Sequence, residues 1–87
     1  MEKDRHEVKA RLVWRVVDDE ALIVDLDSGG FFSLDPVGTE IWRGLHDGLS
    51  VTQIVAAIAA KYGADAGTVQ HDVAELLEDL RREGLVD

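Results

Sequence analysis

The chain has 87 residues, 46% of them hydrophobic, with one proline and eight glycines, which predicts one small globular domain rather than a disordered or fibrous chain. Nine basic and eighteen acidic side chains give a net charge of −9, which disfavours nucleic acid and anionic membranes as partners. Without cysteine, disulfides and thiolate chemistry are excluded. The charged N-terminus does not resemble a signal peptide, and no apolar run reaches the about 20 residues of a membrane span, so we expect a cytoplasmic protein.

The first part of the chain has the period of two that is typical of strands. Alternating apolar residues from Val8 to Val17 predict a half-buried strand. Residues 18–20 form a polar break of hairpin length, and the alternation then resumes at Leu22, Val24 and Leu26 in a second strand. A glycine-containing turn at residues 27–30 leads into a short third strand, Phe31–Leu34.

The second part of the chain has helical spacing and three pairs of start and stop signals. The first predicted helix starts at Asp35 with Pro36 and stops at Asp47-Gly48. The second starts at Ser50 with Gln53 and stops at Gly63. The third starts at Asp65 and ends with Arg81, Arg82 and Gly84. Three strands followed by three helices predict an α+β domain in which the helices pack on one face of an antiparallel meander.

From Ile23 to Val86 the sequence resembles the PqqD-like family. The marks that carry the resemblance are Ser33-Leu34-Asp35, the pair Ile41-Trp42, Asp47-Gly48 before Ser50-x-x-Gln53-Ile54, and Asp72-Val73 with Leu76, Leu77 and Leu80. The family often has Asn where this chain has Asp35, and both residues cap helices. The resemblance implies a winged-helix-like domain that binds the leader segment of a ribosomally made precursor peptide. The leader is expected to add as a strand beside the third strand, in a cleft against the third helix.

Within this family, the sequence looks most like the stand-alone recognition proteins of lasso-peptide clusters. The resemblance implies no catalytic residue and no cofactor, and it implies as partners a leader peptide with a leader peptidase and an ATP-dependent cyclase or another modifying enzyme. A PqqD-type chaperone for a radical-SAM-modified peptide and a winged-helix DNA-binding regulator are the alternatives. Charge disfavours the regulator. We expect residues 1–87 to form a single domain, with residues 1–7 flexible.

The residues themselves also fit a peptide-binding edge. The third strand is uncharged, whereas the first carries Lys9, Arg11 and Arg15, and an unguarded edge favours strand addition. Core packing is an alternative explanation for Phe31 and Phe32 and for the apolar residues of the third helix. Exposure on a solvated helix face is as good an explanation for Asp72 and Asp79 as contact with basic residues of a leader. The candidate peptide-binding residues are Phe31, Phe32, Ser33, Leu34, Val69, Asp72, Val73, Leu76, Asp79 and Leu80.

Nothing in the sequence predicts catalysis or a metal centre. His6, His46 and His71 have no ligand spacing such as i, i+4. No serine stands with a histidine and an acid in a known nucleophile pattern, and Gly29-Gly30 precedes a strand rather than a phosphate-binding helix.

Overall fold

The computed structural model describes residues 4–87, which form three strands followed by three helices, as predicted. The elements are β1 Leu12–Val17, β2 Glu20–Asp25, β3 Phe31–Leu34, α1 Pro36–His46, α2 Val51–Tyr62 and α3 Ala66–Arg82. The expected flexibility of residues 1–7 stays a prediction, and residues 1–3 lie outside the described part of the chain. No helix within residues 4–87 combines the length and the apolar character that crossing a bilayer requires.

The sheet is an antiparallel meander with the order β1-β2-β3. Asp18 and Asp19 both have positive φ, 52° and 65°, which matches a two-residue type I′ hairpin and fixes Val17 opposite Glu20. This register turns Ala21, Ile23 and Asp25 of β2 toward the helices, where all three are buried. The apolar residues that marked this strand in the sequence, at positions 22, 24 and 26, therefore lie on the outer face of the sheet.

The first strand is shorter than predicted, because it begins at Leu12 rather than at Val8. Val8 instead forms an antiparallel bridge with Val86, and the Lys9 amide donates to the Leu85 carbonyl at 2.9 Å. The C-terminal segment thus supplies backbone partners that a reading of local alternation could not reveal.

Each helix begins at its predicted cap. The Asp35 carboxylate accepts from the Gly38 amide at 2.7 Å, and Ser50 and Gln53 form a complete capping box at α2. Asp65 caps α3 by accepting from the Thr68 amide at 3.0 Å. Gly63 ends α2 in the left-handed conformation, with φ of 61°.

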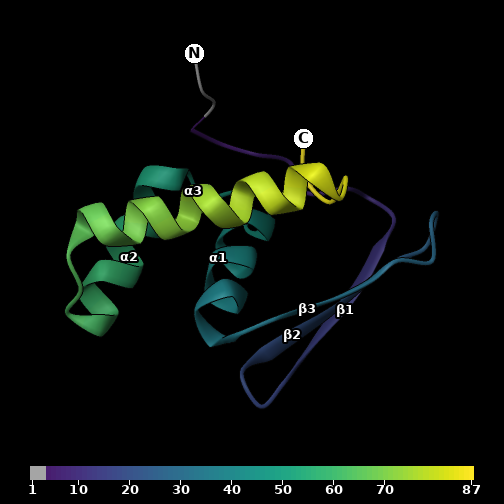
Figure 1. The fold of residues 1–87 in the computed structure, drawn as a ribbon, viewed down its shortest axis with the longest axis horizontal. Coiled ribbons are helices and arrows are strands. Elements are labelled where there is room, and N and C mark those ends of the chain that lie inside the picture. Colours follow the sequence, from purple (N-terminus) through teal and green to yellow (C-terminus); the bar gives the residue numbers. More distant parts are fainter. Residues whose placement is uncertain (1–3) are drawn as a thin grey trace.

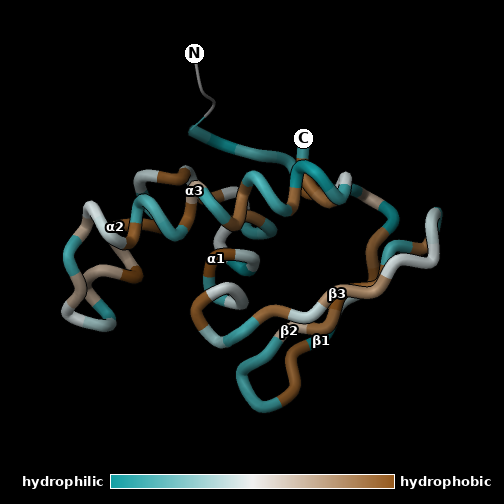
Figure 2. Tube along the Cα trace, viewed as in Figure 1, coloured by the Kyte–Doolittle hydropathy of each residue, from teal (hydrophilic) through white to brown (hydrophobic). Residues whose placement is uncertain are grey.

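Helix α1 runs behind α3 and contacts both β2 and β3, and α2 and α3 pack against α1 and against each other (Figure 1). Hydrophobic stretches occur along the strands and along α1 (Figure 2). Trp42 on α1 is fully buried and meets Trp14 of β1 edge to face, with 6.0 Å between the ring centroids. Gly44 lets α1 approach α2 closely, since a Cβ at this position would lie 2.7 Å from Ile54 Cγ1. The core therefore joins the inner face of the sheet to all three helices.

Candidate functional site

Strand β3 is one edge of the sheet, and within residues 4–87 no further strand pairs with it. Residues of an antiparallel ladder alternate between turning their backbone groups toward the partner and turning them away. The Asp25 amide donates to the Gly30 carbonyl at 2.9 Å, so residues 30, 32 and 34 turn toward β2. The amides and carbonyls of Phe31 and Ser33 therefore point to the free edge.

The side chains of β3 alternate between the two faces of the sheet. Phe32 and Leu34 point inward, are half-buried and pack against the core. Phe31 lies on the outer face, where 64% of it is exposed, and Ser33 is exposed on the same face. A peptide added to this edge would thus meet Phe32 and Leu34 on the helix side and Phe31 on the solvent side.

Helix α3 supplies the other group of predicted residues. Val69, Val73 and Leu80 are buried in the core, whereas Leu76 is half-buried at its margin. Asp72 and Asp79 belong to the same helical stripe and are exposed. Most of the apolar stripe is therefore core, and Leu76 is the apolar member with surface left for a ligand.

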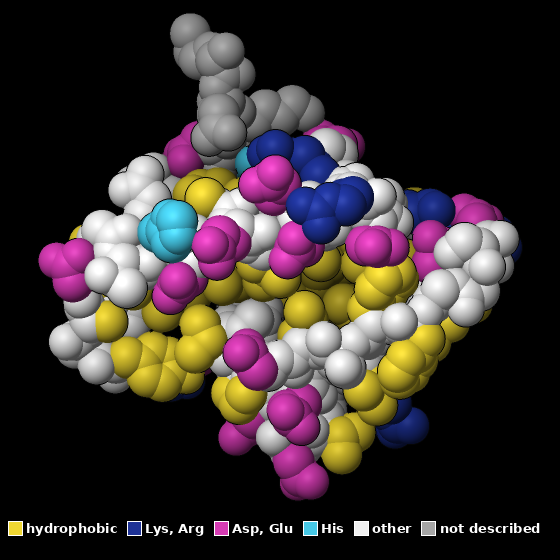
Figure 3. All heavy atoms as spheres, in the orientation of Figure 1, with side chains coloured by type: hydrophobic (Ala, Val, Ile, Leu, Met, Phe, Trp, Pro, Cys, Tyr) yellow, Lys and Arg dark blue, Asp and Glu magenta, His cyan; other side chains and the backbone are white. Residues whose placement is uncertain are grey.

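A hollow floored by hydrophobic side chains separates α3 from β3, and acidic side chains of α3 lie along its rim (Figure 3). Helix α1 contacts both β3 and α3. The exposed Asp79 of α3 pairs with Arg82 at 3.1 Å. The two groups of predicted residues thus come from the two elements that flank this hollow, β3 and α3, although Val69, Val73 and Leu80 themselves belong to the core.

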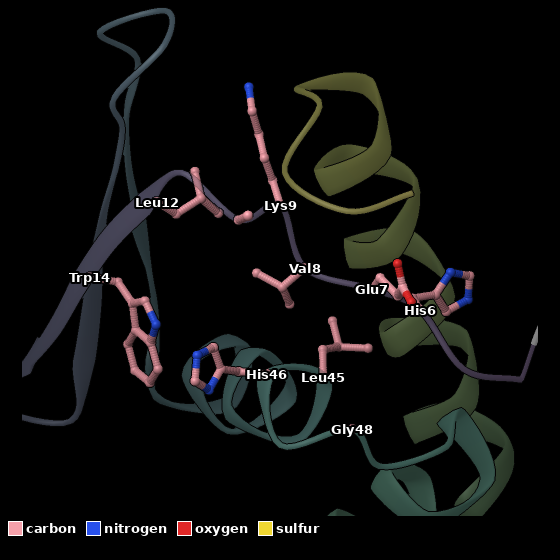
Figure 4. Close-up of a pocket in the computed structure, with 10 residues that line it drawn as sticks. His6, Glu7, Val8, Lys9, Leu12, Trp14, Leu45, His46 and Gly48 are labelled. Carbon is pink, nitrogen blue, oxygen red and sulfur yellow. The ribbon is translucent and has the colours of Figure 1, made fainter.

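Two other hollows contain none of the predicted residues. One, of about 620 Å³, lies on the opposite flank of α3 beside Gln70, Ala74 and Glu78. The other, of about 400 Å³, lies between the N-terminal segment, β1 and the end of α1, where Trp14 faces His46 with ring centroids 5.1 Å apart (Figure 4). Both face away from the free edge of β3.

One buried charge close to the site was missed by the sequence reasoning. The Asp25 carboxylate is buried and accepts hydrogen bonds from Lys9 Nζ at 3.0 Å and from the Asp27 amide at 2.9 Å. The bond from Lys9 holds the pKa of Asp25 below its usual value, and the same bond raises the pKa of Lys9. The sequence signal for this burial is strand alternation, which puts Asp25 on the same face of the strand as Ala21 and Ile23.

Other titratable groups among the described residues form small local clusters, such as Glu40 with Lys61 and Tyr62. His71 lies 3.1 Å from Glu75 on an exposed helix face, and Glu40 pairs with Lys61, which lowers the pKa of that carboxyl. In the part of the chain that the structure describes, no three His, Asp or Glu side chains gather where they could share a metal ion. The free edge of β3 beside the apolar hollow is instead suited to binding an extended peptide.

Comparison with known proteins gives one family and two similar structures. The family model described as coenzyme PQQ synthesis protein D (PqqD) matches residues 20–86. The structure described as TbiB1 in complex with the TbiA(beta) leader peptide is 34% identical, covers 93% of this chain and 94% of its own, and has a TM-score of 0.88. The structure described as lasso peptide synthetase B1 complexed with the leader peptide is 19% identical, with coverages of 95% and 98% and a TM-score of 0.86, and it supports the fold alone. No curated protein sequence matches this chain significantly.

Proposed function

Because the chain belongs to the PqqD family, we propose that it binds the leader segment of a ribosomally made precursor peptide, which adds as a fourth strand along β3. The observation that carries this proposal is the free edge of β3 beside the apolar cleft. The 34% identical TbiB1, whose structure contains a leader peptide, supports the same class of ligand.

The edge offers a defined set of contacts. Phe31 and Ser33 present two amides and two carbonyls, enough for four backbone hydrogen bonds with an antiparallel peptide. Four residues of strand span about 13 Å, so two peptide side chains would enter the cleft on the side of Phe32, Leu34 and Leu76. Backbone pairing supplies affinity in this mode, and the apolar floor supplies selectivity.

The cleft also favours a particular charge in the ligand. Asp72 and Asp79 are exposed on α3, and we assign them to the acidic rim of the cleft, in a chain whose net charge is −9. A leader with apolar anchors and basic residues beside them would meet both the floor and the rim. An acidic leader would be repelled.

The proposed role is to hold the leader while separate enzymes act on the rest of the precursor. In a lasso-peptide pathway these enzymes are a leader peptidase and an ATP-dependent cyclase, and the protein itself contributes no catalytic group. Ribosomal precursors are made in the cytoplasm, so the proposal places the protein there. The description of the family model favours one alternative, a chaperone for a peptide that a radical-SAM enzyme modifies.

A binding titration tests the proposal. The probe is a fluorescein-labelled TbiA(beta) leader peptide, titrated with purified protein and followed by fluorescence anisotropy, with a scrambled peptide and a DNA duplex as controls. We expect saturable binding of the leader, weaker binding of the scrambled peptide, and no saturation with DNA at physiological salt. Tight, sequence-dependent binding of DNA, or no binding either to this leader or to the precursor peptides encoded beside the gene, would overturn the proposal.

A further inference from the structure

We propose that Lys9 and Asp25 are positioning residues that hold β3 at a fixed distance from the C-terminal end of α3, an inference that rests on the proposed function. Both residues lie outside the cleft walls, since Asp25 ends the central strand β2 and Lys9 precedes β1. They act on the peptide through β3 rather than by contact.

One end of the cleft is fixed by the chain itself. Strand β3 passes through Asp35 directly into α1, which also packs against α3. Thr39 of α1 reinforces this junction, since its hydroxyl accepts from the Ala21 amide at 2.7 Å and donates to the Leu34 carbonyl at 3.4 Å. The distance between the two walls at this end therefore follows from α1.

The other end lies between the β2–β3 turn and the C-terminal end of α3, and no covalent segment joins these two directly (Figure 1). The chain after α3 bends back, with the Leu85 amide donating to the Leu80 carbonyl at 2.9 Å. Residues 85–87 then pair with residues 7–9, through the bridge of Val8 with Val86 and the Lys9 amide bonded to the Leu85 carbonyl. We call these two segments the terminal bridge. Because Leu85 and Val86 are buried, the bridge fixes Lys9 to the end of α3.

The side chain of Lys9 completes the connection to the turn. Its ammonium donates to Asp25 Oδ2 at 3.0 Å, and Asp25 Oδ1 accepts the Asp27 amide at 2.9 Å. The Asp25 backbone also accepts from the Gly29 amide at 2.8 Å and donates to the Gly30 carbonyl at 2.9 Å. Asp25 thus organises the turn from which β3 starts, and Lys9 ties that turn to α3.

Burial separates this ion pair from an ordinary surface pair. The side chain of Asp25 is only 3% exposed and that of Lys9 is 32% exposed. The neighbouring pair of Arg11 with Asp27, at 2.7 Å, has side chains that are 66% and 46% exposed, and solvent screens it. Removing Lys9 would leave a buried carboxylate without its cation, which the turn can relieve only by moving toward water. That movement would carry the start of β3 away from α3.

The effect on binding follows from the population of the competent cleft. If, in a variant without the Lys9–Asp25 pair, only about a tenth of the molecules keep the wild-type distance between the turn and α3, the apparent Kd for the leader rises about tenfold. The reason is that the leader binds only this fraction of the molecules. The intrinsic contacts of β3 with the peptide stay the same.

Two methionine substitutions give a matched test with the labelled TbiA(beta) leader. Lys9→Met removes the buried pair, and Arg11→Met removes an equal charge two residues away while leaving Asp25 paired. We expect about a tenfold loss of affinity for Lys9→Met and less than a twofold loss for Arg11→Met. Equal losses in the two variants, or none in either, would overturn the inference.

A distance measurement separates positioning from a general structural defect. The chain has no cysteine, so spin labels at Ser28→Cys in the turn and Arg82→Cys at the end of α3 report this distance alone. Double electron–electron resonance should show a broader distribution in Lys9→Met than in wild type or Arg11→Met, with unchanged helical circular dichroism. An unchanged distance distribution in Lys9→Met would refute the positioning role. Because this measurement needs no bound peptide, a failure of the positioning role can be distinguished from a failure of the proposed function. If Lys9→Met does not fold, Asp25→Asn, which keeps the Oδ1 acceptor, takes its place.

Discussion

Replacing Ser33 with proline tests the backbone part of the proposed binding mode. The register of β3 with β2 turns the Ser33 amide toward the free edge, so the fold itself does not use this donor. Proline removes the donor and places its ring where an added strand would approach. The side chain of Ser33 is exposed on the outer face, away from the apolar floor.

The expected loss can be worked from the contacts at the edge. Of the four hydrogen bonds available at Phe31 and Ser33, proline removes one and leaves a peptide carbonyl without its partner. Such a loss costs about 1 to 2 kcal/mol, which corresponds to about a five- to thirtyfold rise in Kd. Because no bond within the fold is broken, the melting temperature should stay within about 4 °C of wild type.

Fluorescence anisotropy with the labelled leader measures the loss, and thermal circular dichroism measures the stability. Ser33→Ala is the matched control, since it removes the hydroxyl but keeps the amide, and it should bind within about twofold of wild type. If folded Ser33→Pro bound the leader as tightly as Ser33→Ala, the peptide would not pair with this edge, and the proposed mode would be wrong.

Two further predictions concern the cleft wall and the buried pair. Leu76→Asp places a carboxylate at the apolar margin of the cleft and should weaken leader binding more than about tenfold, whereas Ala74→Asp on the opposite flank of α3 should leave the anisotropy titration unchanged. The hydrogen bonds from Lys9 and from the Asp27 amide hold the folded pKa of Asp25 below its usual value, so its stabilising effect is present above the unfolded-state pKa and is lost as the pH falls through the lowered one. Melting curves of wild type and Asp25→Asn should therefore differ by a constant amount from pH 5 to 8 and converge only in stronger acid; a difference that changes near neutral pH would contradict this assignment.

The parts of the fold that the sequence predicted are those governed by neighbours in the chain. Asp35, Ser50 and Asp65 each bond to an amide three residues away, so helix starts were readable from short motifs. The order of the strands and helices followed from the change of period, from two to that of a helix. The inward direction of Phe32 and Leu34 followed from the same alternation.

The parts that the sequence did not predict depend on residues far apart in the chain. Val8 continued an alternating pattern, yet its partner is Val86 in the C-terminal segment. The alternation predicted β2 as a strand but not which of its faces is buried, because its outward positions, such as Leu22 and Val24, are as apolar as the inward ones. Lys9 and Asp25 meet across 16 positions, and neither residue alone indicates an ion pair.

The candidate peptide-binding residues come from β3 and α3, and whether they bind a leader stays a prediction. The outward direction of Phe31 follows from the same alternation that turns Phe32 and Leu34 inward. The sequence could not show that Val73 is wholly covered, because this depends on how the helices pack together in the assembled core.

The pairing of residues 7–9 with residues 85–87 places Glu7 beside Asp87, with the Glu7 amide 3.1 Å from Asp87 Oδ1. The first described residue lies elsewhere, because the Asp4 carboxylate accepts from the Thr52 amide at the start of α2 at 3.1 Å. A chain shortened to begin at Glu7 would suit circular permutation, since a short peptide linker could join residues 7 and 87 while new ends open at the exposed hairpin tip of Asp18 and Asp19. A catalytic domain fused after Asp87 would be attached close to the C-terminal end of α3, and therefore near the cleft.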